Sequence, residues 1–198
     1  MRRTLDSSRK SAKANILAGK FVNRIVGQDT AREALISLLD KFASGMYNKK
    51  KPIGSLLFLG PTGCGKTLVV EALAEGLFGS TDKMLKVDCA EFQHSHEIAK
   101  LIGSSPGYLG HRETNPFFTN ARLLEARTDA TGKEILPFTI ILVDEIEKAS
   151  DALWNLLLGV LDKGRLTLGT NEVVDMTNTI ILMTSNVGAS ELADDSFL

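Results

Sequence analysis

The sequence of 198 residues has few cysteines, almost no net charge and no long apolar run. Its two cysteines, Cys64 and Cys89, are too few for a disulfide-stabilised scaffold and fit a reducing compartment. Lys and Arg number 23 against 24 Asp and Glu, which argues against a surface built to bind polyanions. No stretch approaches about 18 consecutive apolar residues, so the sequence excludes a membrane-spanning helix. We expect a globular domain of the cytoplasm or an organellar matrix, without a membrane partner.

The composition divides the chain into a central domain and two ends. Residues 1–20 carry six basic side chains and one acidic one, and we interpret them as a basic tail or linker, with an organellar transit peptide as the alternative. Residues 191–198 are polar and acidic, and are interpreted as a C-terminal tail. Hydrophobic residues make up 43% of the chain and charged residues 24%, which suits a folded domain over residues 21–190.

Short apolar runs alternate with helical patterns through this central domain. The nearly continuous apolar character of the runs is typical of parallel strands that are covered by helices on both faces. The predicted strands are 55–59, 84–88, 139–143 and 179–184. The predicted helices are 30–44, 66–78, 95–101, 116–127 and 151–161, and 165–175 is predicted to form a hairpin. The alternation predicts an α/β fold with a parallel sheet between helices.

Residues 60–67 read Gly-Pro-Thr-Gly-Cys-Gly-Lys-Thr and fit the pattern G-x-x-x-x-G-K-[ST], between a predicted strand and a predicted helix. The glycines allow backbone N–H groups to surround phosphate oxygens at the positive end of the helix. Lys66 would reach the β- and γ-phosphates of ATP, and Thr67 would bind Mg²⁺ through its hydroxyl. The residues predicted to bind the nucleotide here are Pro61, Thr62, Gly63, Cys64, Gly65, Lys66, Thr67 and Leu68.

A second motif supplies two carboxylates at the end of the predicted strand 139–143. Ligands bind at the carboxyl ends of strands in open α/β sheets, and Asp144 and Glu145 follow this strand directly. Asp144 would hold Mg²⁺, and Glu145 would act as the general base that activates water for attack on the γ-phosphate. The alternative is an ordinary acidic start to a helix. Together with the phosphate-binding loop, the pair predicts a site for ATP or ADP with Mg²⁺.

From about Phe21 to Ser190 the chain resembles the large α/β subdomain of a Clp-type AAA+ ATPase, a P-loop NTPase, and in particular the second ATPase ring of ClpB-like disaggregases. Beyond the two motifs, the matching segments are 25–28 (IVGQ), 52–55 (PIGS), 91–92 (EF), 107–110 (GYLG), 145–149 (EIEKA), 164–167 (GRLT) and 183–186 (MTSN). The resemblance implies a five-stranded parallel sheet and a hexameric ring that threads unfolded or aggregated polypeptide through a central pore. The family's helical lid would follow residue 198, so we expect this stretch alone to be a monomer.

The resemblance also implies roles for individual residues. Ile25 and Val26 would line the adenine pocket, although a core contact explains them equally well. Asn186 would be the first sensor, a neutral amide that holds the attacking water, whereas by itself it would be only a turn former. Tyr108 would line the pore and grip polypeptide by packing, and the alternative is an ordinary surface turn.

One departure from the family pattern opens an alternative function. Relatives place an arginine that reaches the neighbouring subunit's ATP at a hairpin position that is Glu172 here. The alternative to an ATPase module is therefore a nucleotide-binding switch or scaffold with little or no hydrolysis. A DNA-directed AAA+ motor is disfavoured by Tyr108.

Three other groups of residues are interpreted as structural. Cys89, His94 and His96 match no zinc spacing, so no metal site is predicted from them. Lys49–Lys51 is interpreted as a solvated loop, and nucleic-acid binding by it is disfavoured because the chain is neutral overall. Trp154 and the leucines that surround it in 153–161 are predicted to form a buried helix face.

Overall fold

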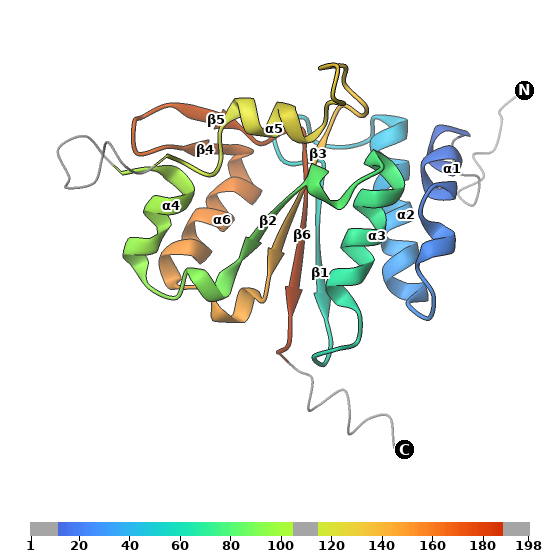
Figure 1. The fold of residues 1–198 in the computed structure, drawn as a ribbon, viewed down its shortest axis with the longest axis horizontal. Helices are drawn as coiled ribbons and strands as arrows, with labels where there is room; N and C mark the ends of the chain where they lie inside the picture. The colour runs from blue at the N-terminus through green and yellow to red at the C-terminus, as the bar shows by residue number, and fades with distance from the viewer. Residues whose placement is uncertain (1–11, 105–114, 188–198) are drawn as a thin grey trace, which may run out of the picture.

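The structure is a computed structural model that describes residues 12–104 and 115–187. Its centre is a parallel sheet with the strand order β1-β6-β3-β2 (Figure 1). The strands are β1 (Gly54–Leu59), β2 (Met84–Asp88), β3 (Thr139–Asp144) and β6 (Thr179–Ser185). Each of the four predicted strands is confirmed to within one residue at either end. The α/β fold with a parallel sheet is therefore confirmed.

The last strand of the described residues lies between two earlier ones, and this order positions the candidate site. Strand β6 pairs with β1 on one side and with β3 on the other. The register places Leu59 opposite Ser185, and Asp88 opposite Asp144. Since the strands are parallel, the segments that follow β1, β3 and β6 all emerge at the same edge of the sheet.

The parallel sheet has four strands in the described part of the chain, and a fifth strand, which the resemblance implies, is not among the described residues. Four apolar runs in the sequence became four strands, whereas the fifth strand rested on the resemblance alone. Strand β1 lies at the edge of the sheet and has no partner on its outer side among the described residues. Its Leu57 and Leu59 are 46% and 54% exposed.

Helices cover both faces of the sheet (Figure 1). Alternate residues of the strands enter two apolar clusters, as the two-residue period of a strand requires. Ile140 and Leu142 belong to the cluster with α2 and α3, whereas Ile141 and Val143 belong to the cluster with α4, α5 and α6.

The helices are α1 (Ala12–Gly19), α2 (Asp29–Ser44), α3 (Lys66–Phe78), α4 (Ala99–Ile102), α5 (Asn120–Ala126) and α6 (Asp151–Lys163). Short 3₁₀ turns are η1 (Val22–Arg24), η2 (Thr81–Lys83), η3 (Cys89–Glu91), η4 (Ser95–Ile98) and η5 (Ile146–Lys148). Among the described residues, no helix has the length and apolar character needed to cross a bilayer.

Helix α1 makes part of the predicted basic tail a part of the core. Ala14, Leu17 and Ala18 are buried, and α1 packs against α2. These three apolar residues follow the i, i+3, i+4 spacing of a helix face, a signal that the count of basic residues in 1–20 concealed. Part of the segment 1–20, expected to be a basic tail or linker, thus packs on the domain as α1. Residues 1–11 and 191–198 lie outside the described residues.

Two further predictions concern the chain between residues 151 and 175. The hairpin is confirmed, because β4 (Arg165–Thr167) pairs antiparallel with β5 (Val173–Asp175). The buried face of α6 is confirmed only in part. Leu153 and Leu157 are buried, but Trp154 and Leu158 are 36% and 55% exposed. Successive residues of a helix are about 100° apart, so adjacent apolar residues cannot all face the core.

Candidate nucleotide-binding site

The loop between β1 and α3 borders a hollow of about 240 Å³ at the carboxyl edge of the sheet. Gly63 and Gly65 have φ angles of 82° and 91°, a left-handed conformation that glycine adopts without steric cost. Gly65 is the N-cap of α3, and the first turn of this helix also lines the hollow with residues 66–68. The hollow is lined by Thr62, Gly63, Gly65, Lys66, Thr67, Leu68, Asp144, Glu145, Thr184 and Asn186. The structure therefore brings both predicted motifs and the predicted sensor residue together.

The ammonium group of Lys66 lies across this loop and makes three hydrogen bonds to oxygen atoms of the chain, besides a longer one of 3.9 Å to Cys64 Sγ. Its Nζ donates to the carbonyl oxygens of Gly60 at 2.7 Å and Pro61 at 2.9 Å. It also donates to Oδ1 of Asn186 at 2.8 Å. An ammonium group has three N–H donors, so a phosphate that binds Lys66 must replace at least one of these partners.

Asp144 is the most heavily hydrogen-bonded carboxylate of the hollow. Its Oδ1 accepts from Thr67 Oγ1 at 3.1 Å and from Thr184 Oγ1, and its Oδ2 lies 3.0 Å from Lys86 Nζ. Burial raises the pKa of Asp144, but the hydrogen bonds from Thr184 and Lys86 outweigh burial and hold this pKa below its usual value. Asp144 is therefore ionised at neutral pH, as a ligand of a divalent cation must be.

Glu145 is held by its backbone and by its side chain. It has a φ angle of 55°, which is uncommon for a residue with a side chain. Its N–H donates to Thr184 Oγ1 at 2.9 Å, and its Oε2 lies 2.6 Å from Lys148 Nζ in an i,i+3 ion pair. The backbone thus turns sharply where the strand delivers its second carboxylate to the hollow.

Three residues of this site were not singled out from the sequence. Thr184 joins Asp144 to the backbone of Glu145, Lys86 pairs with Asp144, and Glu147 accepts a hydrogen bond from Asn186. Thr184 had a signal, because a polar residue in a largely apolar strand that is predicted to be buried needs a hydrogen-bond partner, and its side chain is indeed 1% exposed. Lys86 and Glu147 had none, since their partners Asp144 and Asn186 are distant in the sequence.

A second hollow of about 350 Å³ adjoins the first and shares Gly63, Gly65 and Leu68 with it. Its lining includes Ile25 and Val26, as the adenine-pocket prediction requires. Their side chains differ, because Ile25 is 3% exposed and Val26 is 86% exposed. Gln28 connects this segment to the phosphate-binding loop by donating from Nε2 to the Cys64 carbonyl oxygen at 2.8 Å.

The other residues considered in the sequence analysis are not among those that line the two hollows. Tyr108 lies outside the described residues. Glu172 is exposed in the hairpin turn, and its Oε1 lies 3.4 Å from Asn120 Nδ2. Cys89 is fully buried, and no cluster of three or more candidate metal ligands occurs among the described residues.

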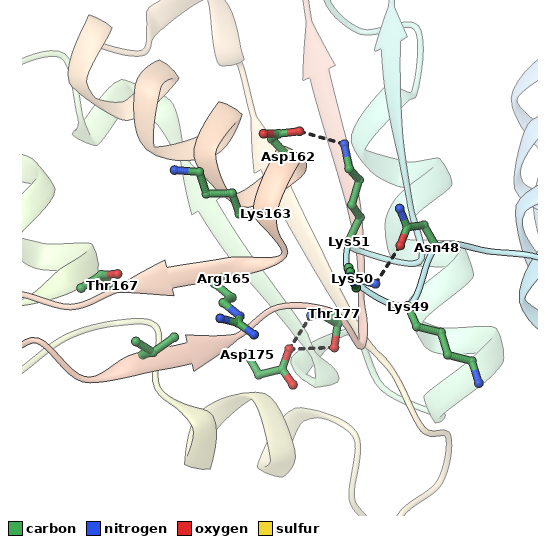
Figure 2. Close-up of a pocket in the computed structure, with 11 residues that line it drawn as sticks. Asn48, Lys49, Lys50, Lys51, Asp162, Lys163, Arg165, Thr167, Asp175 and Thr177 are labelled. Atoms are coloured by element: carbon green, nitrogen blue, oxygen red, sulfur yellow. Dashed lines mark hydrogen bonds and ion pairs between the residues drawn. The ribbon is translucent and has the colours of Figure 1, made fainter.

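The Lys49–Lys51 loop borders a larger hollow of about 1010 Å³ at the opposite edge of the sheet, beside the hairpin (Figure 2). Five basic residues line this hollow with two acidic ones: Lys49, Lys50, Lys51, Lys163, Arg165, Asp162 and Asp175. Both carboxylates are engaged, because Asp162 pairs with Lys51 at 2.8 Å and Asp175 accepts from the Thr177 N–H and hydroxyl. The loop was predicted to be solvated, and its lysines border open space. Two further basic residues, Lys163 and Arg165, border the same space.

A family model described as AAA domain (Cdc48 subfamily) matches residues 51–198. The chain belongs to this AAA family. The chain is 42% identical to the ATP-dependent Clp protease ATP-binding subunit ClpC of Staphylococcus aureus (strain USA300), over 188 residues that cover 95% of this chain and 22% of that protein. It is also 42% identical to the ClpC subunit of Staphylococcus epidermidis, over 88% of this chain and 20% of that protein. The chain therefore spans about a fifth of the length of these relatives. The predicted relationship to Clp-family AAA+ ATPases is confirmed.

Proposed function

We propose that this AAA domain binds ATP or ADP together with Mg²⁺ in the two adjoining hollows and hydrolyses ATP. The observation that supports the proposal is the meeting of three separate segments at one edge of the sheet. The phosphate-binding loop, the Asp144–Glu145 pair and Asn186 all line the same hollow. Backbone N–H groups at a helix N-terminus and a lysine favour a polyphosphate there.

The residues of the hollow fit a magnesium ion. Thr67 and Asp144 place a hydroxyl and an ionised carboxylate within 3.1 Å of each other, and Mg²⁺ prefers such oxygen ligands. When bound, Mg²⁺ supplies positive charge that stabilises the phosphate oxygens. The two residues would hold this ion between the loop and the end of β3.

The other polar residues of the hollow have distinct proposed roles. Lys66 would exchange its carbonyl partners for the β- and γ-phosphates. Glu145 would accept a proton from the attacking water as general base, after its carboxylate leaves Lys148. Asn186 would hold that water, because an amide both donates and accepts. Val26 and Leu68, which are 86% and 67% exposed, would pack against adenine in the second hollow.

The finer features implied by the Clp resemblance are part of the same proposal. A fifth strand would pair with the outer side of β1, which has no partner among the described residues. In a complete protein the domain would form part of a hexamer that threads unfolded or aggregated protein, with Tyr108 in the pore. The names of the relatives, ATP-binding subunits of an ATP-dependent Clp protease, support this assignment.

Calorimetry with ADP and with a slowly hydrolysed ATP analogue tests nucleotide binding. Wild type should bind both in the presence of Mg²⁺, and Lys66→Ala should reduce the affinity by more than about tenfold, because hydrogen bonds to charged groups are worth about 1.5–3 kcal/mol each. Lys41→Ala, an exposed lysine on α2, is the matched control and should bind as wild type does. Equal affinities of wild type and Lys66→Ala would refute the proposed site.

The second candidate function is a nucleotide-binding switch or scaffold that hydrolyses ATP slowly. It is favoured by Glu172, which is exposed in the hairpin turn. An arginine that reaches a neighbour's ATP is worth about 10³–10⁵ in rate, and a carboxylate in that place would repel the γ-phosphate. In the assembled protein, Glu172→Arg should then raise kcat at least about tenfold. A wild type that already turns over rapidly, with no change in Glu172→Arg, would exclude the switch.

A further inference from the structure

The side-chain amide of Asn186 bridges two groups of opposite charge. Its Oδ1 accepts a hydrogen bond from Lys66 Nζ at 2.8 Å. Its Nδ2 donates to Glu147 Oε1, also at 2.8 Å. The three residues come from different parts of the chain, namely the first turn of α3, the end of β6 and the η5 turn. They form a continuous row from the phosphate-binding loop to the segment that follows β3.

The chemistry of the two neighbours determines which way the amide faces. An ammonium group only donates hydrogen bonds, and an ionised carboxylate only accepts them. With the amide turned by 180°, Oδ1 would face the Glu147 carboxylate and Nδ2 would face the Lys66 ammonium, and both hydrogen bonds would be lost. Burial raises the pKa of Glu147, but nearby hydrogen-bond donors, among them the Asn186 amide, hold this pKa below its usual value. The carboxylate is thus ionised at neutral pH and accepts only.

The two neighbours of Asn186 differ in what nucleotide binding would do to them. All three N–H donors of Lys66 are used within the chain, so a bound phosphate would replace at least one of the present partners of the ammonium group. Glu147 lies on the far side of Asn186 and does not line the hollow. Its hydrogen bond with Asn186 can therefore persist while a phosphate occupies the loop.

We propose that Glu147 is a positioning residue that orients the Asn186 amide toward the γ-phosphate. An amide nitrogen carries two hydrogens, so one can remain on Glu147 while the other points to the γ-phosphate or to the attacking water. Glu147 thereby makes the site prefer ATP over ADP, because ADP has no γ-phosphate for Asn186 to contact. This inference rests on the proposed function and adds to it a residue that acts through Asn186.

Calorimetry on three variants of the chain tests the proposal. Glu147→Ala should lower the affinity for a slowly hydrolysed ATP analogue about tenfold, the effect of one lost charge-assisted hydrogen bond. Its affinity for ADP should stay within about twofold of wild type, since the contact concerns only the γ-phosphate. Glu147→Gln keeps the shape of the side chain but can face Asn186 with its own amide in either orientation, so it should show a smaller loss in the same direction. Glu33→Gln, an exposed glutamate on α2, is the matched control and should bind both nucleotides as wild type does.

Each result separates this proposal from the proposed function. A wild type that binds neither nucleotide refutes the proposed function itself. A wild type that prefers the ATP analogue, with the same preference in Glu147→Ala and Glu147→Gln, refutes the positioning role alone. Equal losses for ADP and the ATP analogue would also overturn it, because they would show a merely structural role for Glu147. If Glu147→Ala does not fold, as judged by circular dichroism, the isosteric Glu147→Gln decides by the same comparison.

Discussion

The hydroxyl of Thr67 donates a 3.1 Å hydrogen bond to the carboxylate of Asp144, although 77 residues separate them in the chain. Thr67 comes from the first turn of α3 and Asp144 from the last position of β3. The contact joins the two motifs that the sequence predicts independently. It also brings together the two oxygen ligands that we propose for Mg²⁺.

Thr67→Ala should remove the effect of Mg²⁺ on nucleotide binding. Wild type should bind ADP at least about tenfold more tightly with Mg²⁺ than with a chelator, and the variant should bind equally in both, since metal-site changes cost about 10–100-fold in metal affinity. Titration calorimetry in the two buffers measures this difference. Thr170→Ala, in the exposed hairpin turn, is the control. A full Mg²⁺ effect in Thr67→Ala would contradict the assignment.

Glu145→Gln should reduce ATP hydrolysis without weakening ATP binding. The amide keeps the size of the side chain but cannot accept the proton of the attacking water, and general-base catalysis is worth about 10²–10⁴ in rate. A phosphate-release assay on the assembled protein measures turnover, and calorimetry measures binding. Turnover within twofold of wild type would exclude Glu145 as the base.

Gly76→Ala should destabilise the chain, whereas Gly159→Ala should not. A Cβ at Gly76 would lie 2.7 Å from the Lys20 carbonyl oxygen and 2.7 Å from Phe21 Cβ, so the segment after α1 must move away from α3. Overpacking of this kind costs about 1–3 kcal/mol. A Cβ at Gly159, in the middle of α6, would meet no atom within 4 Å. Since alanine favours a helix by about 1 kcal/mol over glycine, Gly159→Ala should raise the free energy of unfolding. Urea denaturation of both variants tests the packing of residues 12–21, and equal stabilities would contradict it.

Leu157→Ala and Leu158→Ala should differ strongly, although the residues are neighbours on α6. Leu157 is 6% exposed and Leu158 is 55% exposed. Truncating the buried side chain should lower the free energy of unfolding by about 2–5 kcal/mol, because it leaves a cavity. Truncating the exposed one should change it by less than about 0.5 kcal/mol. A large loss in Leu158→Ala would mean that its side chain is covered in solution.

The two cysteines should react with thiol reagents at very different rates. Burial, reinforced by the negative charges of Asp88 and Asp144, raises the pKa of Cys89 to about 12, and its side chain is fully buried. Because the thiolate is the reactive form, Cys89 should stay unmodified in the native chain from pH 7 to 10 and react only after unfolding. The pKa of Cys89 is higher in the folded chain than in the unfolded chain, so the protonated thiol favours folding. This contribution to the free energy of unfolding is fully present below the unfolded-state pKa and is lost as the pH rises toward 12. Cys64, which is partly exposed in the phosphate-binding loop, should be the one cysteine that reacts in the native chain. Labelling of Cys64→Ser at pH 8 provides the check, and rapid labelling of this variant would contradict the burial of Cys89.

The sequence by itself determined the features that depend on neighbouring residues. Four largely apolar runs became the four strands of the parallel sheet. The signal is strongest for β3 and β6, because a strand buried on both faces needs apolar residues at consecutive positions. The phosphate-binding loop could be recognised because its glycines, Lys66 and Thr67 act within eight consecutive residues. Asp144 and Glu145 could be assigned because they directly follow a strand that had already been identified.

The tertiary structure decided the features that depend on the order of the strands. Strand β6 is the last of the described strands and lies between β1 and β3, which places Asn186 between Lys66 and Glu147, and Thr184 beside Asp144. The spacing of apolar residues indicates which segments are strands but contains no information on which of them pair. The same limit applies to α1 and α6, because an apolar side chain such as Leu17 or Leu158 is buried only if another element covers it. Leu17 has such a neighbour in α2, and the described part of the chain leaves Leu158 uncovered.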